Sequence, residues 1–341
     1  MNILKVLIIC AFTVKLALST TPEEEKAKDL ISKLTLEEKI SFLAGIHSDY
    51  VGATPSIPRL NIPSIYYGDG PQGAGNNKKN VTEFPSVLTV TASWNRKLMY
   101  DYAAAIAEEQ WGKGVSVHLG PMVNIARVPI GGRNFESIGE DPFLASELTR
   151  EYVKGVQDKG VIACVKHWVN NEHEHERMKY NANVDERTNQ EIYYPPFKAA
   201  VEEGVASVMC SYNKINGTYA CENAETLNKE LKGRMGFKGF VMSDWGATHD
   251  ALNSFKNGLD QDMPGDDEPY LQQITDLVNK GVISEAEIEK PITKILSQFI
   301  KFNLFENPTQ GSIKNNVRSD QHTKLAKLVA EESMVLLKNE N

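Results

Sequence analysis

Short apolar runs alternate along the chain with longer helical stretches, and this alternation constrains the fold more than any other feature of the sequence. Each run is five or six residues long and ends at, or just before, a glycine or a polar residue, which is typical of strands buried on both faces. Repeated strand–helix units predict a parallel sheet with helices outside it. The runs are, in order, Ile62–Tyr67, Val115–Leu119, Val161–Val165, Ala206–Cys210 and Gly239–Asp244.

The number and continuity of these units favour a particular α/β architecture. About six to eight strand–helix units lie in one block, which favours a (β/α)8 TIM-like barrel over the alternative, a doubly wound sheet. Neither a glycine-rich phosphate loop nor a dinucleotide fingerprint follows any of the runs. The chain has 341 residues, of which 41% are hydrophobic, and that is enough to bury one large core or two smaller ones.

Helix-capping signals mark where several of the helices begin. Thr21, Thr35 and Ser284 each have a glutamate three residues later, which is the spacing of a capping box. Further helices are expected where apolar residues recur on one face. The longer predicted helices are Asn95–Trp111, Pro142–Lys159, Asn189–Glu203, Tyr270–Lys280 and Glu285–Phe302.

The first nineteen residues read as a secretory signal peptide. Lys5 precedes the apolar stretch Val6–Val14, and Ala17 and Ser19 are the small residues expected before a cleavage site. Lys15 interrupts the stretch, so a membrane span, which needs ~20 apolar residues, is not expected. The alternative is a buried N-terminal helix. We therefore expect a secreted, extracellular protein with no membrane partner.

The cysteines fit an oxidising compartment. The ten residues between Cys210 and Cys221 contain the turn-like sequence Lys-Ile-Asn-Gly, so a hairpin could bring the two thiols within disulfide reach. Cys164 lies inside an apolar run and is expected to be a buried free thiol. If the chain is secreted, Asn80 and Asn216 begin glycosylation sequons.

The net charge excludes one class of partner. Lys and Arg number 37 and Asp and Glu 45, so the formal charge is −8, and no long basic run offsets it. Nucleic-acid binding depends on neutralising phosphates with basic residues. We therefore expect no nucleic-acid partner.

Polar and charged residues collect just after the predicted strands. In a barrel, active sites lie at this carboxyl-terminal rim. A single such residue could be a helix cap or a loop contact, but five clusters that mix carboxylates, bases and aromatic rings point to a site. The clusters begin at Asp69, Arg133, Lys166, Ser211 and Asp244.

The mixture of side chains suits a sugar. Charged groups can bond hydroxyls that both donate and accept, while Trp and Tyr cover the apolar face of a pyranose. A carboxylate beneath the ring carbon can attack it and form a glycosyl-enzyme. Asp244 is the best candidate, because it ends a strand, precedes Trp245, and lies between Ser243 and Gly246, which allow a tight turn.

Five motifs, in the same order, resemble those of glycoside hydrolase family 3, most closely its secreted fungal-type β-glucosidases. The similarity runs from about residue 25 to the end of the chain and implies a (β/α)8 first domain. The motifs are Gly68–Gly73, Gly132–Glu136 with Glu140–Pro142, Lys166–His167, Val241–Ala247 and Gly258–Gly265.

The resemblance implies a role for each matching residue. Asp244 is implied as the nucleophile, Asp69 as a ligand of glucose hydroxyls, and Tyr212 as a neighbour of the nucleophile. The remaining hydroxyls would be bound by Arg133, Lys166 and His167, and the aglycone side would be shaped by Met209 and Trp245. The motif at Asp69 favours glucose over xylose. Asn124 departs from the Asp often found there in the family, and it is expected to lie off the site.

The resemblance also implies that part of the catalytic machinery lies elsewhere. In most of the family, the acid/base glutamate belongs to a second α/β domain. We expect the barrel to span residues 20–310, and residues 311–341 to form a linker and the start of a truncated second domain. Some single-domain members carry an Asp–His pair instead, but Val169–Tyr180 does not match that pattern. The expected partner is a β-glucoside or cello-oligosaccharide. The alternative function is a non-catalytic, secreted sugar-binding remnant or an inactive fragment.

Two acidic regions raise the question of a metal. His173 and His175 alternate with glutamates, but Arg177 stands where a His-Glu-x-x-His motif needs its second His. The acidic run Asp262–Glu268 lacks the ligand alternation of a calcium loop. We therefore expect no metal and no cofactor.

Overall fold

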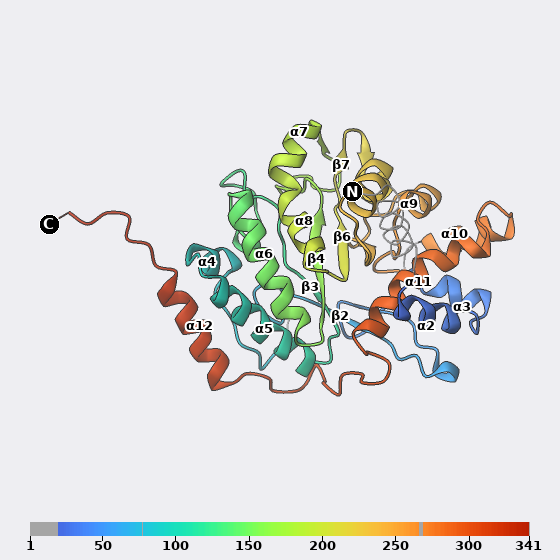
Figure 1. Ribbon diagram of the computed structural model, residues 1–341, viewed down its shortest axis with the longest axis horizontal. Helices are drawn as coiled ribbons and strands as arrows, with labels where there is room; N and C mark the ends of the chain where they lie inside the picture. The colour runs from blue at the N-terminus through green and yellow to red at the C-terminus, as the bar shows by residue number, and fades with distance from the viewer. Residues whose placement is uncertain (1–19, 77, 266–268, 341) are drawn as a thin grey trace, which may run out of the picture.

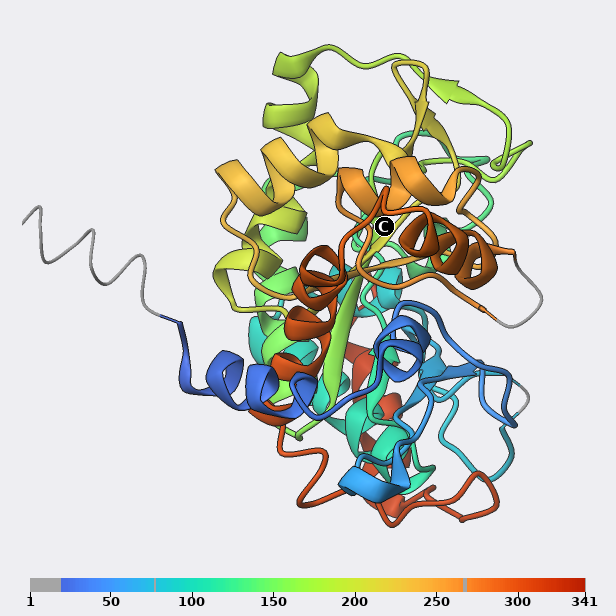
Figure 2. The same cartoon turned by 90° about the vertical axis from the view of Figure 1, so that its right-hand side faces the viewer.

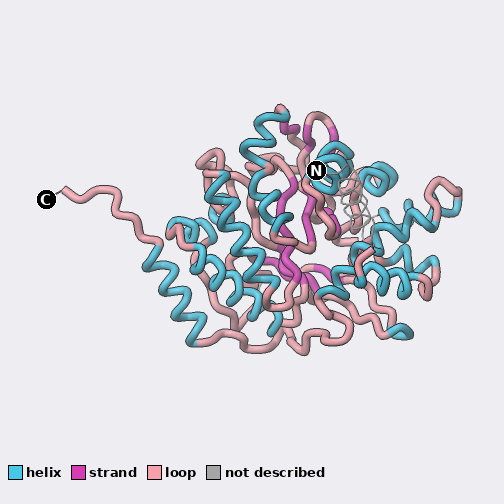
Figure 3. Tube along the Cα trace, viewed as in Figure 1, coloured by secondary structure: helices cyan, strands magenta, loops and turns pink. Residues whose placement is uncertain are grey.

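A computed structural model describes residues 20–76, 78–265 and 269–340. The proposed signal peptide, residues 1–19, lies outside the described residues. A central sheet carries helices on its outside, as predicted for an α/β fold (Figures 1 and 3). Among the described helices, none is both long enough and apolar enough to cross a bilayer.

The sheet has six strands in a simple order. They are β1 (Gly52–Ala53), β2 (Tyr66–Asp69), β3 (Val117–Leu119), β4 (Ile162–Trp168), β6 (Ser207–Cys210) and β9 (Phe240–Ser243). From β2 to β9 all neighbours are parallel, as predicted, whereas β1 is antiparallel to β2. The short strand β1 was not among the predicted runs. Its connection to β2 contains a single 3₁₀ turn at Pro58–Leu60 and no crossover helix of the kind that usually joins parallel neighbours.

Isolated β-bridges continue the sheet beyond β9. Met242 pairs with Gln261, Asp262 pairs with Ala44, and Ile46 pairs with Ala53 of β1. The short segments around Gln261 and Ala44 therefore lie between the two edge strands of the six-stranded sheet.

The helices mostly follow the predicted pattern. Thr21, Thr35 and Ser284 form capping boxes as predicted. The helices α5, α6 and α8 lie side by side along the sheet, and α11 packs against α2 (Figures 1 and 2). The helices are α2 (Pro22–Ile31), α3 (Leu36–Ser41), α4 (Val87–Ala92), α5 (Arg96–Gly112), α6 (Pro142–Gln157), α7 (Glu186–Thr188), α8 (Pro195–Glu202), α9 (Ala251–Asn257), α10 (Tyr270–Asn279), α11 (Glu285–Lys301) and α12 (Asp320–Glu332).

One predicted helix is divided in the structure. The stretch predicted as a single helix over Asn189–Glu203 contains a π-helical turn, η3 (Asn189–Tyr193), followed by α8 from Pro195. Proline lacks a backbone N–H and fits only the first turn of a helix, so a new helix begins there.

A small second sheet carries the hairpin that the cysteine spacing suggested. It consists of β5 (Asn181–Ala182), β7 (Lys214–Ile215) and β8 (Thr218–Tyr219). Asn216 and Gly217, at the hairpin turn, have φ values of 48° and 97°. Left-handed conformations at both central positions suit Asn-Gly, which explains the tight turn.

The segment after residue 310 contains a helix that the sequence prediction did not include. His322 of α12 is buried, and its imidazole contacts the carboxylates of Glu108 and Glu109 on α5. Beyond α12 the chain continues away from the body of the molecule (Figure 1), and the side chains of Met334–Leu337 are exposed.

The core includes charged residues at one end of the sheet. All seven residues of β4 are buried, among them Lys166 and His167. Charged groups are rarely buried unless they have partners. Their burial identifies this end of the sheet as the place to look for a site.

Candidate active site

A cavity of about 290 Å³ lies at the carboxyl end of the parallel strands. Its size is at the lower end of the range for small-molecule sites. All eight residues that the sequence proposed for catalysis or sugar binding line it. The lining residues are Val51, Asp69, Leu119, Arg133, Lys166, His167, Arg177, Met209, Tyr212, Asp244 and Trp245.

The strands explain why residues far apart in the sequence meet here. Asp69 is the last residue of β2, Met209 lies in β6, and Asp244 directly follows β9. Parallel strands end at one edge of the sheet, so residues at their ends become neighbours. The register of β6 and β9 places Cys210 beside Ser243, and the Asp244 N–H donates to the Cys210 carbonyl oxygen at 3.1 Å.

The Asp244 carboxylate is buried and incompletely bonded. Its Oδ1 accepts the Trp245 N–H at 2.8 Å, while Oδ2 has no hydrogen-bond partner. Burial raises the pKa of Asp244, and the Trp245 N–H and the nearby Lys166 ammonium offset part of that rise. The Tyr212 hydroxyl also lowers the pKa of Asp244, and Oδ2 is a buried acceptor with no donor in hydrogen-bond geometry.

Asp69 differs from Asp244 in its surroundings. Its Oδ1 accepts hydrogen bonds from Lys166 Nζ at 3.0 Å and from the Gly70 N–H at 3.0 Å. Burial alone would raise the pKa of Asp69, but the Lys166 ammonium and the Gly70 N–H hold it below its ordinary value. Asp69 is therefore a firmly ionised acceptor. Lys166 remains charged, because burial, which lowers its pKa, is more than offset by the attraction of Asp69 and Glu136 together.

Arg133 and His167 lie together between the two aspartates. Arg133 Nε donates to Glu136 Oε1 at 2.5 Å, and its Nη1 lies 3.2 Å from His167 Nε2. Burial, followed by the positive charges of Arg133, Lys166 and Arg177, lowers the pKa of His167 far below its usual value. The imidazole is therefore neutral.

Sequence reasoning missed one charged residue of the cavity, along with two apolar ones. Arg177 lies with its guanidinium 4.5 Å from the centre of the Tyr212 ring and donates to Glu174. A basic residue in a polar loop gives no sequence signal of this role. Asn124 does not line the cavity, but its side chain supports the site from behind through two hydrogen bonds to the backbone of His167. Sequence position could not reveal this contact, which crosses 43 residues.

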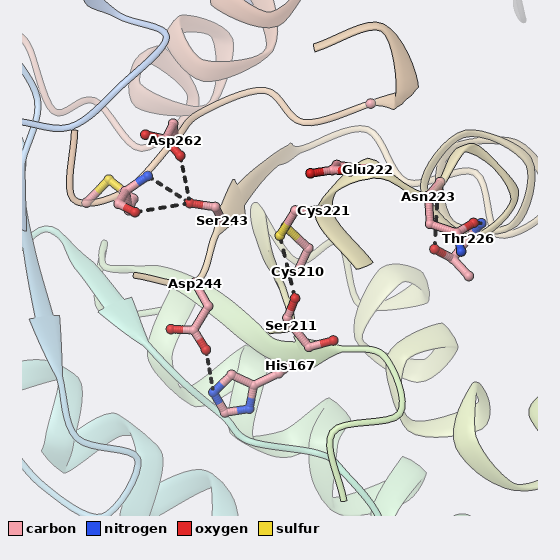
Figure 4. The surroundings of a disulfide bond; sticks show 12 residues. His167, Cys210, Ser211, Cys221, Glu222, Asn223, Thr226, Ser243, Asp244 and Asp262 are labelled. Carbon is pink, nitrogen blue, oxygen red and sulfur yellow. Dashed lines mark hydrogen bonds and ion pairs between the residues drawn. A yellow bond between two sulfur atoms is a disulfide. The ribbon is translucent and has the colours of Figure 1, made fainter. Parts of the chain in front are cut away.

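A disulfide braces the Asp244 side of the cavity. Cys210 and Cys221 are bonded, with their Cα atoms 5.3 Å apart, and Cys164 is free and buried, as predicted. Figure 4 shows the bridge beside His167 and Asp244. Because Cys210 ends β6, the bridge ties the hairpin to the strand adjoining β9.

A second cavity of about 510 Å³ adjoins the first and shares Asp69 and Arg133 with it. It is the larger of the two, but Lys166, His167 and Asp244 line only the smaller one. The chemistry therefore belongs to the smaller cavity, and the larger one offers space beyond Asp69.

The other candidate features lie outside the cavity. Among the described residues, no group of three or more His, Cys, Asp or Glu could hold a metal, and His173 stacks on Tyr180 with ring centres 4.2 Å apart.

The two sequon asparagines, Asn80 and Asn216, are both exposed. The side chain of Asn216 exchanges two hydrogen bonds with the backbone of Val184.

Known proteins are similar in sequence to most of the chain. The chain is 41% identical over 326 residues to thermostable beta-glucosidase B of Acetivibrio thermocellus, covering 92% of this chain and 42% of that protein. It is 40% identical over 319 residues to beta-glucosidase B of Emericella nidulans, covering 92% of this chain and 37% of that protein. The chain therefore spans less than half the length of these relatives.

Solved structures agree with the sequence relatives. Beta-glucosidase 3B of Thermotoga neapolitana, solved in complex with glucose, superposes with a TM-score of 0.85 at 35% identity, covering 92% of this chain and 48% of that one. Beta-D-glucoside glucohydrolase of Trichoderma reesei gives a TM-score of 0.88 at 34% identity, covering 93% and 46%. The sequence profile of the glycosyl hydrolase family 3 N-terminal domain matches residues 44–298. With that match over most of the chain, the protein belongs to glycosyl hydrolase family 3.

Proposed function

We propose that this chain is the sugar-binding and nucleophile-bearing part of a retaining β-glucosidase. The observation that carries the proposal is the Asp244 carboxylate, buried in the cavity wall with Oδ2 unbonded beside groups suited to hydroxyls. The names of the sequence relatives and the glucose bound in the Thermotoga neapolitana structure support the same activity.

Asp244 Oδ2 attacks the anomeric carbon of a terminal β-D-glucose, and the bond to the leaving oxygen breaks. This step forms a glycosyl-enzyme and releases the alcohol or sugar that was attached. Water then attacks the same carbon and gives one proton to the acid/base residue that completes the site, while Asp244 leaves as a carboxylate. Asp69, Arg133 and Lys166 hold the ring hydroxyls during both steps. Tyr212, Met209 and Trp245 shape the cavity wall around the reacting carbon and the aglycone.

The proton for the leaving group comes from a residue outside this cavity. Asp69 and Asp244 are the two carboxylates that line it, and Asp69 is held ionised by Lys166, so it is a poor acid. The relatives extend well beyond the length of this chain. We propose that a second domain of the kind found in the family completes the site with its acid/base residue. The alternative, a secreted sugar-binding protein without catalysis, shares the same cavity but predicts no covalent intermediate.

The architecture and location are proposed on the same basis. The bridges at Gln261, Ala44 and Ile46 support closure of the sheet into a (β/α)8-type barrel over residues 20–310. The disulfide and the sequons at Asn80 and Asn216 support secretion after removal of residues 1–19. Residues 311–341 would connect the barrel to the second domain.

A fluorinated glucoside with a good leaving group tests the proposal. Such a leaving group departs without a proton, so the first step is expected even without the acid/base residue, whose absence costs roughly 10²–10⁴-fold on cellobiose. Peptide mapping should find the label on Asp244. Azide, which needs no base, should release a glucosyl azide from an ordinary activated glucoside. Glucose binding without any labelling would instead support the non-catalytic alternative, and labelling of Asp69 would overturn the assignment.

A further inference from the structure

The hydrogen bonds around His167 leave only one position for its proton. The Asn124 side chain bonds the backbone of His167 on both sides, because Oδ1 accepts the His167 N–H at 2.8 Å and Nδ2 donates to the His167 carbonyl oxygen at 3.0 Å. A backbone N–H can only donate and a carbonyl can only accept. These two bonds therefore fix which end of the Asn124 amide is oxygen.

The oriented amide constrains the imidazole. The same Asn124 Oδ1 lies 3.3 Å from His167 Nδ1. An amide oxygen can only accept, so Nδ1 must carry a proton for this contact to be a hydrogen bond.

The other ring nitrogen is constrained independently. His167 Nε2 lies 3.2 Å from Arg133 Nη1. A guanidinium has donors and no acceptor, so Nε2 must offer its lone pair. We propose that Asn124 is a positioning residue that fixes His167 as the neutral imidazole with its proton on Nδ1, leaving Nε2 as an acceptor in the cavity. This role rests on the proposed function, because it concerns the same sugar site.

The assignment changes how the contact between His167 and Asp244 is understood. Nε2 lies 3.5 Å from Asp244 Oδ2 (Figure 4), a distance that an imidazolium could use as an ion pair. With the proton on Nδ1, both facing atoms are acceptors, and Oδ2 has no other hydrogen-bond partner. The Nε2 lone pair is already directed at Arg133 Nη1, so a hydroxyl that approaches this pair must donate to Oδ2, which leaves the carboxylate ionised.

Charge around the imidazole favours the same state. The positive groups that act on His167 are Arg133, Lys166 and Arg177, and the carboxylate facing it is Asp244. On the far side of Asn124, its Nδ2 also donates to Glu172 Oε1 at 3.3 Å. Burial raises the pKa of Glu172 to about 8, so this group is largely protonated at neutral pH.

A second buried histidine provides an internal reference with the opposite tautomer. Tyr152 Oη donates to the Pro71 carbonyl oxygen at 2.5 Å, so it accepts from His118 Nε2 at 2.9 Å. Gln110 Nε2 lies 3.3 Å from His118 Nδ1 and acts as its donor. His118 therefore has its proton on Nε2, and burial lowers its pKa to about 3.

Nitrogen NMR of the imidazole-labelled chain tests the proposal. His167, assigned by its absence in His167→Gln, should show a protonated Nδ1 and an unprotonated Nε2 between about pH 5 and 8, the range in which a free histidine titrates. His118 should show the reverse pattern in the same spectrum. A proton on His167 Nε2, or an imidazolium in this range, would overturn the proposal.

Substitution of Asn124 tests whether this residue sets the state. Asn124→Asp places a carboxylate at Nδ1–H, and the proton on Glu172 can be donated to it. The pKa of His167 should then rise by about one to three pH units. Asn124→Leu, which keeps the size but removes the acceptor at Nδ1, leaves only the Arg133 contact to set the tautomer. Part of the His167 population should then carry its proton on Nε2. Asn170→Asp is the matched control, because the buried Asn170 amide bonds Asn189 instead of the imidazole, and it should leave His167 unchanged.

The outcomes separate this inference from the proposed function. An unchanged tautomer and pKa of His167 in both Asn124 variants would show that Asn124 has only a structural role. Failure of the fluorinated glucoside to label Asp244, with the tautomer as expected, would refute the catalytic proposal and leave the role of Asn124 in place. Thermal unfolding of each variant identifies any that do not fold, and the wild-type spectrum tests the tautomer without them.

Discussion

The ends of β2 and β9 each present an aspartate to the same cavity, but the two carboxylates are held in opposite ways. The Asp69 side chain is 40% exposed, bonds a buried lysine, and has a lowered pKa. The Asp244 side chain is 10% exposed, has one unbonded oxygen, and has a raised pKa. Both residues are aspartates at the carboxyl end of a parallel strand, so their pKa values differ because their neighbours differ.

Under the proposed function, this difference suits the two carboxylates to different tasks. A carboxylate that a lysine already neutralises is suited to holding hydroxyls in place. A buried carboxylate with a free oxygen is a better nucleophile, because the protein has not satisfied it and a substrate can. A buried acceptor without a donor costs stability, and functional sites commonly carry such a cost.

The largest expected effect is on the rate of glycosyl-enzyme formation, which should depend on Asp244 far more than on Asp69. Asp244→Asn removes the nucleophile and should slow formation of the glycosyl-enzyme by roughly 10⁴-fold or more. Stopped-flow release of the leaving group from an activated glucoside measures this step. Asp250→Asn is the matched control, because Asp250 is exposed and caps α9, and Asn caps a helix equally well. A comparable loss in Asp69→Asn would show that the two carboxylates are not divided as described.

The second effect concerns binding. Asp69→Asn exchanges a charged acceptor for a neutral one and should weaken glucose binding by about 10–100-fold, the equivalent of one hydrogen bond to a charged group. Calorimetric titration with glucose measures the dissociation constant, and Asn at the exposed Asp49 provides the control. Unchanged affinity would mean that Asp69 does not bind the sugar.

The third effect tests the brace that only the Asp244 side possesses. The Cys210–Cys221 bridge closes a loop with a sequence separation of 11 residues, so its removal should lower the free energy of unfolding by about 2–3 kcal/mol in the chain-entropy model. Urea unfolding of Cys210→Ser/Cys221→Ser measures this change. Thiol titration of the unreduced, denatured chain from residue 20 onward should find Cys164 as one free thiol. Three thiols would contradict the bridge.

The smallest expected effect is on stability, because substitutions of the two aspartates should change the free energy of unfolding in opposite directions. The pKa of Asp244 is raised in the folded chain, so its ionised form destabilises the fold at neutral pH, and this cost disappears as the pH falls through the folded pKa. Asp244→Asn should therefore stabilise the chain by about 1 kcal/mol at neutral pH.

Asp69 should behave in the opposite way. Its pKa is lowered, so its contribution to stability is present above the unfolded pKa and is lost as the pH falls through the folded one. Asp69→Asn should destabilise by about 1 kcal/mol at neutral pH, because buried Lys166 loses its ionic partner, while the 40% exposure of the Asp69 side chain screens the pair. Urea unfolding of both variants at several pH values gives the two signs. A change of the same sign in the free energy of unfolding of both variants would contradict the contrast between the two aspartates.

The sequence alone determined the elements and most of the site. Capping boxes at Thr21, Thr35 and Ser284 fixed three helix starts, and the alternation of apolar runs identified the parallel strands. Because such strands end at one edge, the sequence also identified Asp244 and its neighbours as one cluster. These signals are local, and local patterns are readable without knowing long-range contacts.

Only the tertiary structure decided the features that depend on contacts between distant residues. The antiparallel placement of β1, the packing of His322 against Glu109, and the presence of Arg177 in the cavity have no local signal. The same holds for the properties of the two aspartates. Asp69 meets Lys166 across 97 residues, and Asn124 meets His167 across 43. Burial and neighbouring charges set the pKa or the tautomer of a side chain, and these surroundings exist only in the folded chain.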